Sequence, residues 1–442
     1  MRGVATRKAG KSPRSCISVV IISWVLIVAW LIFLWYCWKS GLLHSSKIAY
    51  VDKFINKTEH VIFDRVNKLK HIPTIIDTSS SHLDASIVVP KLYDVHVVFS
   101  TDCSGFQDWQ TLVVFHSATV VGQLGPITRI ASGCDSQKQA VLTALYKKLY
   151  PNYHVHFTPD FKHDKKSNKK YDFYNKPYGM EHWLENAMPP IQENVVIALI
   201  DPDFVFLRPL TTKIAGESNL IITSVNAAKE SFEKIIRGKP VAQQYGLGAP
   251  WANDHHVHFN RTKICGAHSP CLEPDQSFAA RHYSVGPPYM VEKSDMLRLT
   301  KAWTSFVPVV YEGYPHLLAE MYAYSMGAAH ERLPHLQVDH YMVSNTDAGG
   351  EGWQWVDLLE DVCAPPQNGI YFPGKPLPTF AHHCQFYRAG EMGFQKRRIP
   401  HNIFSCESPL LLEPPVDLGF VDYKVNDAKV DGLGSPTFPH PS

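Results

Sequence analysis

The chain has 442 residues and a formal net charge of only +2 at pH 7. No long basic run follows its N-terminal segment, which argues against nucleic acid as a partner. Roughly 350 residues remain beyond that segment and the stem that follows it, enough for one large α/β domain or two smaller lobes.

An apolar segment near the N-terminus predicts a membrane anchor. Ile17–Trp38 contains 22 residues without a charge, long enough to cross a bilayer as a helix and longer than the apolar core of a cleaved signal peptide. Basic residues without any acid precede it, which keeps residues 1–16 in the cytosol by the positive-inside rule. These basic residues are Arg2, Arg7, Lys8, Lys11 and Arg14. We therefore expect a single-pass type II protein in the Golgi membrane, with the endoplasmic reticulum as the alternative, and a lumenal catalytic domain.

The lumenal part divides by composition. Residues 39–90 carry scattered polar residues without sustained alternation, which is typical of a stem. We expect one domain over residues 91–410, followed by a proline-rich tail over residues 411–442. Sequons at Asn56 and Asn260 agree with a lumenal location.

Seven cysteines follow the apolar segment, where disulfides persist if the compartment is the secretory lumen. Cys265 and Cys271 are near enough to close a small loop, and Cys384 with Cys406 is a second plausible pair. The absence of any Cys-x-x-Cys spacing argues against a structural zinc site.

From Asp94 onward, predicted strands alternate with predicted helices. The strands cover residues 94–100, 128–131, 154–158 and 195–200. The helices cover residues 108–120, 135–150 and 177–188. This alternation predicts a mainly parallel sheet flanked by helices. Farther along, glycine, proline and aromatic residues crowd residues 245–251, 286–289 and 311–316, and two more helices are expected over residues 293–306 and 315–328.

Two aspartates directly follow the most apolar of these strands, in the stretch NVVIALIDPDFVFLRPL (Asn194–Leu210). Ligands of α/β folds bind beyond the carboxyl ends of the strands, which is where Asp201 and Asp203 would lie. Two neighbouring carboxylates repel each other unless a cation separates them, and hard oxygen ligands suit Mg²⁺ or Mn²⁺. The alternative without a metal site is a pair of solvated carboxylates at the end of a strand.

Several blocks resemble the plant and algal peptidyl glycosyltransferases, namely the peptidyl serine α-galactosyltransferases and the hydroxyproline O-arabinosyltransferases. These blocks are FSTDCSGFQDWQTLVVFHSATVVGQLGPITRI (Phe99–Ile130), NKPYGMEHWL (Asn175–Leu184), IDPDFVFLRPL, AEMYAYSMGAA (Ala319–Ala329) and FAHHCQFY (Phe380–Tyr387). The phrases DWQT and GPITR favour the serine galactosyltransferase branch. Together these blocks span about residues 94–388, most of the expected lumenal chain, and the resemblance implies a GT-A-like fold.

The resemblance also implies a metal site with Asp203 as a direct ligand and Asp201 on the metal or the ribose. A Mn²⁺ or Mg²⁺ ion there would stabilise the departing UDP. The third ligand would be a late histidine. His382 takes that position in the family pattern, while His383 stands where the family has tyrosine, so the choice between the two stays open.

Three basic residues are candidates for binding the UDP-sugar. Arg129 follows a glycine-proline turn, a suitable place for reading uracil or phosphate, although a structural ion pair fits equally well. Lys176 could meet a phosphate or anchor the helix after it. Lys396 opens a run of three basic residues that could close over the diphosphate or form a solvated surface.

Glu320 is an isolated carboxylate in an apolar and aromatic predicted helix, where burial without a partner is costly. It could act with Asp203 in catalysis by stabilising positive charge on the sugar or accepting a hydroxyl hydrogen bond. It could equally pair with a structural arginine such as Arg298 or Arg332.

The sequence thus favours a metal-dependent, retaining glycosyltransferase. It would move a sugar, galactose first, from a UDP donor to serine or hydroxyproline of a proline-rich secreted protein. Arabinosyl transfer from UDP-arabinofuranose to hydroxyproline is the alternative within the class. A non-catalytic lumenal sugar-binding protein and a membrane-anchored metal hydrolase are the alternatives from other classes, and UDP-sugar turnover separates them.

Overall fold

The structure is a computed structural model that describes residues 93–163, 169–213, 234–338, 341–344, 370–372, 375–376, 378–389, 392–400, 403, 408 and 423–425. The predicted cytosolic tail, membrane anchor and stem lie outside these residues, as does most of the proline-rich tail. Among the residues described, no helix combines the length and apolarity that a membrane span requires. The chain divides into two compact units, and every helix and strand below belongs to the unit formed by Leu92–Arg398 and Leu418–Ser442.

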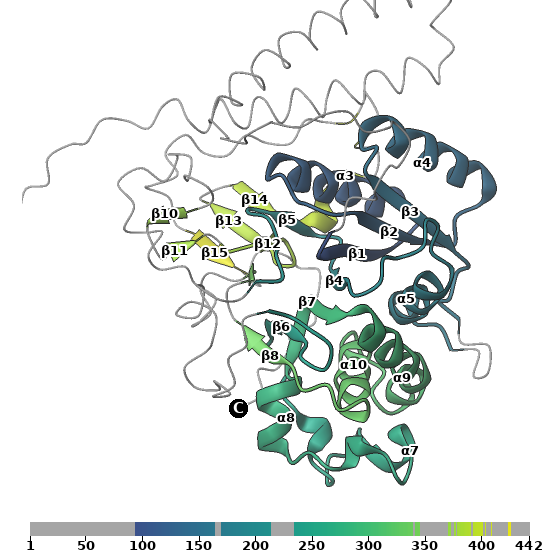
Figure 1. The fold of residues 1–442 in the computed structure, drawn as a ribbon, viewed down its shortest axis with the longest axis vertical. Helices are drawn as coiled ribbons and strands as arrows, with labels where there is room; N and C mark the ends of the chain where they lie inside the picture. Colours follow the sequence, from purple (N-terminus) through teal and green to yellow (C-terminus); the bar gives the residue numbers. More distant parts are fainter. Residues whose placement is uncertain are drawn as a thin grey trace, which may run out of the picture. The chain divides into compact units, whose positions relative to one another are not determined.

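A seven-stranded sheet forms the centre of this unit, in the order β3-β2-β1-β4-β7-β6-β8 (Figure 1). Its strands are β1 (Val95–Asp102), β2 (Ile127–Ser132), β3 (Tyr153–Thr158), β4 (Val196–Ile200), β6 (Val241–Gln244), β7 (Val285–Glu292) and β8 (Leu336–Val338). Only β7 runs antiparallel to its two neighbours, and all other pairs in this sheet are parallel. The predicted mainly parallel α/β sheet is therefore confirmed.

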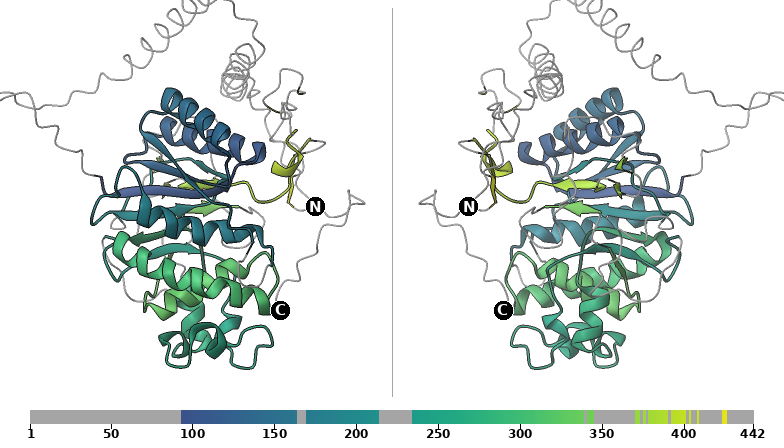
Figure 2. Two further views of the ribbon diagram at one scale, coloured as in Figure 1. Left: turned by 90° about the vertical axis from the view of Figure 1, so that its right-hand side faces the viewer. Right: turned by 90° about the vertical axis from the view of Figure 1, so that its left-hand side faces the viewer.

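Helices cover both faces of the sheet (Figures 1 and 2). One face carries α3 (Gly105–Val120) and α4 (Ser136–Leu149), and the other carries α5 (Asn175–Asn186), α9 (Lys293–Gly313) and α10 (Ala319–His330). The shorter helices are α7 (Arg261–Cys265), α8 (Gln276–Tyr283) and the 3-10 turns η1 (Asp172–Tyr174), η2 (Pro250–Ala252), η3 (Pro270–Leu272) and η5 (Lys396–Arg398). Helix α4 begins as predicted, with the Asp135 carboxylate accepting a hydrogen bond from the backbone N–H of Lys138.

The sequence of strand β4 is apolar without alternation because both faces of the strand are buried. Val196, Ala198 and Ile200 join the core beneath α3 and α4, whereas Ile197 and Leu199 join the core shared with α5, α9 and α10. Because successive side chains point to opposite faces, a strand covered on both sides must be apolar throughout. The carboxyl end of this strand therefore emerges from the middle of a rigid sheet.

The glycine- and proline-rich residues 286–289 belong to the central sheet. They lie inside β7, between β4 and β6. The pairing of β6 with β7 shifts register here, with Ala242 opposite Tyr289 and Gln243 opposite Gly286. Pro287 and Pro288 fall in that bulge, where the ladder requires no N–H donor, so a central strand tolerates them.

A second, three-stranded sheet brings a late segment of the chain to the end of β4. Its order is β5-β12-β9, with β5 (Phe204–Phe206), β12 (Phe380–His382) and β9 (Met342–Val343). Strand β12 runs antiparallel to β5, with His382 opposite Phe204. The remaining strands are β10 (Ile370–Phe372), β11 (Lys375–Pro376), β13 (Tyr387–Ala389), β14 (Met392–Phe394) and β15 (Tyr423–Val425).

Two disulfides are present among the described cysteines. The predicted Cys265–Cys271 bridge is confirmed, and a second bridge joins Cys103 to Cys134. The latter ties the loop after β1 to the loop after β2, next to the sheet edge where β4 ends. Cys384 has a free thiol, and its predicted partner Cys406 lies outside the described residues.

Candidate active site

The aspartate pair lies in the turn between β4 and β5, beyond the carboxyl end of the central sheet. The carbonyl of Asp201 accepts a hydrogen bond of 3.2 Å from the backbone N–H of Phe204, which closes the turn around Pro202. The Asp201 side chain is 23% exposed and that of Asp203 is 5% exposed. One carboxylate therefore reaches the solvent side of the site while the other lies inside it.

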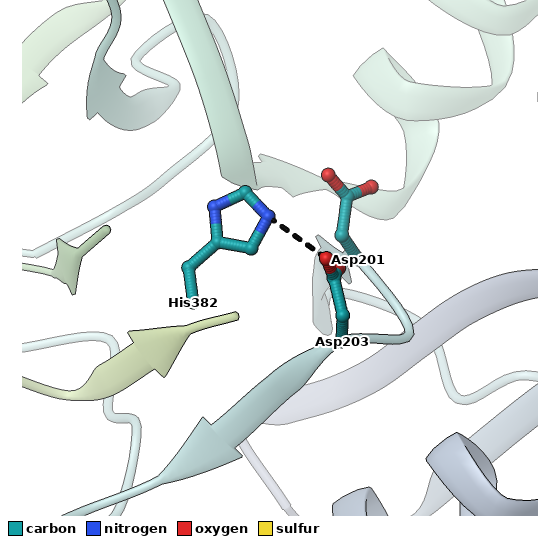
Figure 3. A group of neighbouring side chains, drawn as sticks. All are labelled: Asp201, Asp203 and His382. Carbon is teal, nitrogen blue, oxygen red and sulfur yellow. Dashed lines mark ion pairs between the residues drawn. The ribbon is translucent and has the colours of Figure 1, made fainter. Parts of the chain in front are cut away.

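His382 joins the two aspartates because β12 pairs with β5 (Figure 3). One ligand atom from each of Asp201, Asp203 and His382 lies within 4.8 Å of the others. His382 Nε2 lies 3.3 Å from Asp203 Oδ2, and its Nδ1 lies 3.0 Å from the Met342 thioether sulfur. Because a thioether only accepts hydrogen bonds, Nδ1 carries the proton, and Nε2 is the nitrogen turned toward the carboxylates.

The neighbouring His383 has a different environment. Its backbone N–H donates to the carbonyl of Asp203 at 3.1 Å, which fixes the loop. Its ring lies against Tyr387 and Phe394, with centroid distances of 6.2 and 5.6 Å. Of the two histidines that the sequence left open, His382 is the one whose ring meets both aspartates.

Positive charge already surrounds Asp203. Lys396, at the start of η5, forms an ion pair with Asp203 Oδ2, on the same carboxylate that His382 faces. Burial by itself would raise the pKa of Asp203, but His382 and Lys396 hold it well below its usual range. Burial by itself would lower the pKa of His382, but the Asp203 carboxylate raises it to about 10. The pocket is thus built to keep a carboxylate ionised and to hold cationic groups beside it.

A second cluster of charged side chains, Lys176 and Glu320, lies beside Asp201. The Lys176 ammonium, in the first turn of α5, lies 2.9 Å from Asp201 Oδ1 and 3.1 Å from Glu320 Oε1. Burial would lower the pKa of Lys176, but these two carboxylates raise it. Burial raises the pKa of Glu320, with Lys176 opposing and Asp201 adding to the shift. Lys176 is therefore the cation that allows two acidic side chains to lie near each other.

This pairing replaces the partners that the sequence suggested for Glu320. Arg298 pairs with Asp295 and Glu331, and Arg332 pairs with Glu273. Glu320 is held instead from several sides of α10. Its backbone N–H donates to the Tyr171 hydroxyl at 3.1 Å, and its carbonyl accepts from Trp303 Nε1 at 2.7 Å. Among the described residues its Oε2 is buried without a hydrogen-bond partner.

Replacing Lys176 with methionine is expected to lower the free energy of unfolding by about 2 kcal/mol, because Glu320 then keeps a buried charge without a partner. Its raised pKa lets Glu320 take up a proton, which limits the loss. The double variant Lys176→Met/Glu320→Gln should recover most of the stability. Chemical denaturation of the single and double variants measures this coupling. Equal stability of Lys176→Met and the wild-type protein would contradict it.

Asp201, Asp203 and His382 fit a divalent cation by their chemistry. Two carboxylates and one imidazole are a donor set that accepts Mn²⁺ or Mg²⁺, and their ligand atoms converge. The open side at Asp201 leaves room for ligands supplied by a substrate. Lys396 occupies one face of Asp203 in this structure, so a cation would share that carboxylate with it or displace it.

Arg129 lies outside this group, and its environment corrects the expectation that it binds the donor. Its side chain has no exposed surface. Its guanidinium donates to the Thr101 hydroxyl at 2.8 Å, the Asp108 carboxylate at 2.9 Å, the Tyr146 hydroxyl at 2.5 Å and the Asp102 carbonyl at 2.9 Å. A fully enclosed guanidinium bound in these ways ties β1 and β2 to α3 and α4. The structure therefore shows Arg129 in a structural ion pair with Asp108.

Three contacts at the site carry no sequence signal. Met342 lies on β9 and orients His382, and the Cys103–Cys134 bridge fixes the loops beside β4. Neither residue pair has a characteristic spacing, because each joins segments that meet only in the folded chain. The Lys176–Glu320 pair spans 144 residues and is equally invisible to local pattern analysis.

The class of molecule follows from this geometry: an α/β protein with a candidate divalent-metal site at the carboxyl edge of its sheet. Residues 95–239 match the model of the hydroxyproline O-arabinosyltransferase family N-terminal domain. The chain is 27% identical over 258 residues to the peptidyl serine alpha-galactosyltransferase of Arabidopsis thaliana, covering 57% of this chain and 28% of that protein. It is 25% identical over 262 residues to the Chlamydomonas reinhardtii protein of the same name, covering 54% and 30% respectively.

These matches confirm the resemblance to this superfamily that the sequence blocks indicated. The chain spans less than a third of the length of these two curated relatives. Two crystal structures of the galactosyltransferase LgtC, one with donor and acceptor sugar analogs and one of an active-site mutant, align with 65% of this chain and 87% of theirs. Their identity is 9% and their TM-scores are 0.35 and 0.34, so this likeness carries no argument.

Proposed function

We propose that this protein is a metal-dependent glycosyltransferase with a GT-A-like domain. It moves a sugar, galactose first, from a UDP donor to a serine or hydroxyproline hydroxyl of a secreted protein. The observation that carries the proposal is the convergence of Asp201, Asp203 and His382 at the carboxyl edge of the sheet. Asp201 and Asp203 lie within residues 95–239, which match the hydroxyproline O-arabinosyltransferase family N-terminal domain model, and His382 lies outside that match.

In this proposal Asp201, Asp203 and His382 hold Mn²⁺ or Mg²⁺. When bound, the cation supplies Lewis-acid stabilisation of the charge that develops on the departing diphosphate. Asp203 is the ligand best prepared for this role, since its carboxylate is buried and stays ionised. His382 is held by Met342 with Nε2 toward the cation, which limits the reorganisation required on binding.

The remaining charged residues orient the donor. Lys396 lies beside Asp203 on a short turn, and its ammonium would offer positive charge to the diphosphate. Lys176 fixes Asp201 and Glu320 relative to each other. Glu320 Oε2, which is buried and lacks a hydrogen-bond partner among the described residues, is an acceptor for a sugar hydroxyl. No step here requires a covalent intermediate. The resemblance implies that the sugar keeps its anomeric configuration, with the acceptor hydroxyl attacking from the face that UDP leaves.

The proposal places the domain in the secretory pathway. It rests on the apolar segment Ile17–Trp38, the basic residues before it and the sequons, all read from the sequence. Asn260 is exposed in the structure, as a glycan acceptor must be. Protease protection of residues 91–410 in sealed Golgi vesicles, with the N-terminus accessible outside them, tests the type II orientation.

Arabinosyl transfer is the second candidate, and it is favoured by the match to a family model named for hydroxyproline O-arabinosyltransferases. The two activities differ in the sugar and in the acceptor residue. In this proposal the same candidate cation site serves both activities, because UDP is the leaving group of both donors. Only the donor and the acceptor peptide distinguish them.

The deciding experiment incubates the full-length protein with Mn²⁺, UDP-galactose or UDP-arabinofuranose, and peptides that contain serine or hydroxyproline. We expect a hexose mass gain on serine, lost when EDTA removes the cation and restored by excess Mn²⁺. A pentose gain on hydroxyproline would establish the second candidate. Consumption of neither donor, together with no UDP binding in calorimetry, would refute the proposal.

A further inference from the structure

A surface hollow is lined in part by Tyr171, whose hydroxyl contacts the backbone of Glu320 in the candidate active site. Its volume is about 300 Å³, and it is formed by η1 and by the loop between α9 and α10. Phe173 and Leu317 line it, and each is 40% exposed. An exposed pair of large apolar side chains in one hollow marks a binding surface more often than scattered single residues do.

The floor of the hollow is aromatic and rigid. Tyr171 stacks on Tyr311 with a centroid distance of 4.1 Å and an interplanar angle of 21°, and Phe173 lies 5.4 Å from Tyr171. The Tyr171 hydroxyl donates to the Leu317 carbonyl at 2.7 Å, and the Tyr311 hydroxyl donates to the Lys170 carbonyl at 3.3 Å. These bonds hold the two walls together, so the surface is formed before any partner arrives.

One residue connects this floor to the charged site. Tyr171 accepts a hydrogen bond from the backbone N–H of Glu320 at 3.1 Å, and Glu320 contacts Lys176, which contacts Asp201. A chain bound in the hollow would therefore contact Tyr171, the residue that holds the backbone of Glu320, and the proposed function places the sugar beside Glu320.

The rim of the hollow carries one charge of each sign, and these pair with each other. Lys170 Nζ lies 3.6 Å from Asp172 Oδ1, with both side chains about three-fifths exposed. A rim neutralised in this way attracts neither acidic nor basic ligands strongly. It favours an uncharged occupant that offers flat apolar surface to the aromatic rings.

We propose that this hollow binds a proline- or hydroxyproline-rich segment of the acceptor chain, in an extended polyproline II conformation, beside the residue that receives the sugar. Such segments are uncharged and stiff, and they bind aromatic-lined grooves because little conformational entropy is lost. The inference rests on the proposed function, and the family model and relatives name hydroxyproline and peptidyl serine as what those proteins act on.

The test uses a fluorescein-labelled peptide of alternating serine and hydroxyproline, and the same peptide with glycine at each hydroxyproline. Binding to the full-length protein with UDP and Mn²⁺ is followed by fluorescence anisotropy. Phe173→Ser should raise the Kd for the hydroxyproline peptide roughly tenfold, as loss of an aromatic anchor does, and Leu317→Ser should raise it less. The affinity for UDP and the melting temperature should not change in either variant.

Phe278→Ser is the matched control, because Phe278 is 37% exposed on α8 and does not line the hollow. It should bind the hydroxyproline peptide like the wild-type protein. Equal affinity of the wild-type protein for the glycine peptide, no binding of either peptide, or no effect of Phe173→Ser and Leu317→Ser would overturn the inference. So would a dimer in sedimentation that only the two hollow variants convert to monomer while peptide binding persists.

Failure of the proposed function would look different. The wild-type protein would then bind the peptide through Phe173 without transferring any sugar to it, and the hollow would remain a peptide-binding surface. Suppose instead that the protein transfers sugar and that Phe173→Ser does not alter the KM for the peptide. The proposed function would then stand, and the assignment of the hollow as the peptide-binding surface would be refuted.

Discussion

Replacing Asp203 with asparagine is expected to lower the rate of sugar transfer roughly 10²–10³-fold, the size of effect seen when one group that stabilises transition-state charge is removed. Asp203 is the central member of the group, since both His382 and Lys396 contact its carboxylate. Asparagine keeps the volume and can still accept a hydrogen bond, but it has no charge to offer a divalent cation. Calorimetry should show weaker Mn²⁺ binding, and the transfer assay should show the loss of rate.

Asp94→Asn is the matched control for this change. Asp94 precedes β1 at the opposite end of the strand, where its exposed carboxylate pairs only loosely with Lys234 at 3.6 Å. This variant should bind Mn²⁺ and transfer sugar like the wild-type protein. An Asp203→Asn variant with unchanged Mn²⁺ affinity would show that the three-residue group is not the cation site, even if its activity fell.

The parallel half of the sheet could be predicted because its signal is local. Strands β1, β2 and β3 are each followed along the chain by a helix (α3, α4 and α5), and a crossover helix of this kind enforces parallel pairing. The other half could not. Strand β7 contains two prolines, which forbid a central strand unless a bulge removes the need for donors, and the bulge exists only once β6 is in place.

Some residues of the candidate site could likewise be predicted from local sequence, and others are brought together only by the fold. Asp201 and Asp203 could be found because their position after β4 is written in adjacent residues. His382 was found through a family pattern, and its separation from His383 needed the pairing of β12 with β5. The contact of Lys176 with Glu320 had no predictor at all, because basic residues suit many partners and only the fold brings these two within 3.1 Å.

Arg129 shows how one sequence signal serves two roles. An arginine after a glycine-proline turn at the start of a strand can read an anion or anchor a core, and residue type and spacing are the same for both. Burial separates them. A guanidinium with no exposed surface and donors directed at Thr101, Asp108, Tyr146 and the Asp102 carbonyl is already committed.

Arg129→Met should therefore destabilise the protein by about 3–5 kcal/mol, the cost of removing one partner from a buried charge pair. Asp108 would keep Lys138 as a partially exposed partner, but the Tyr146 hydroxyl and the Asp102 carbonyl would lose their donor inside the core. Arg332→Met is the matched control, because Arg332 forms an exposed pair with Glu273 whose side chains are 65% and 58% exposed. Its loss should cost less than about 1 kcal/mol.

Affinity for UDP separates the structural role of Arg129 from the donor-binding role. We expect Arg129→Met, measured below its lowered melting temperature, to bind UDP and Mn²⁺ with wild-type affinity, because Asp201, Asp203 and His382 do not contact this residue. A variant that melts like the wild-type protein but binds UDP at least tenfold more weakly would reverse this conclusion. The guanidinium would then have to leave the Asp108 pair to meet the nucleotide, and the buried network would be one state of a movable arginine.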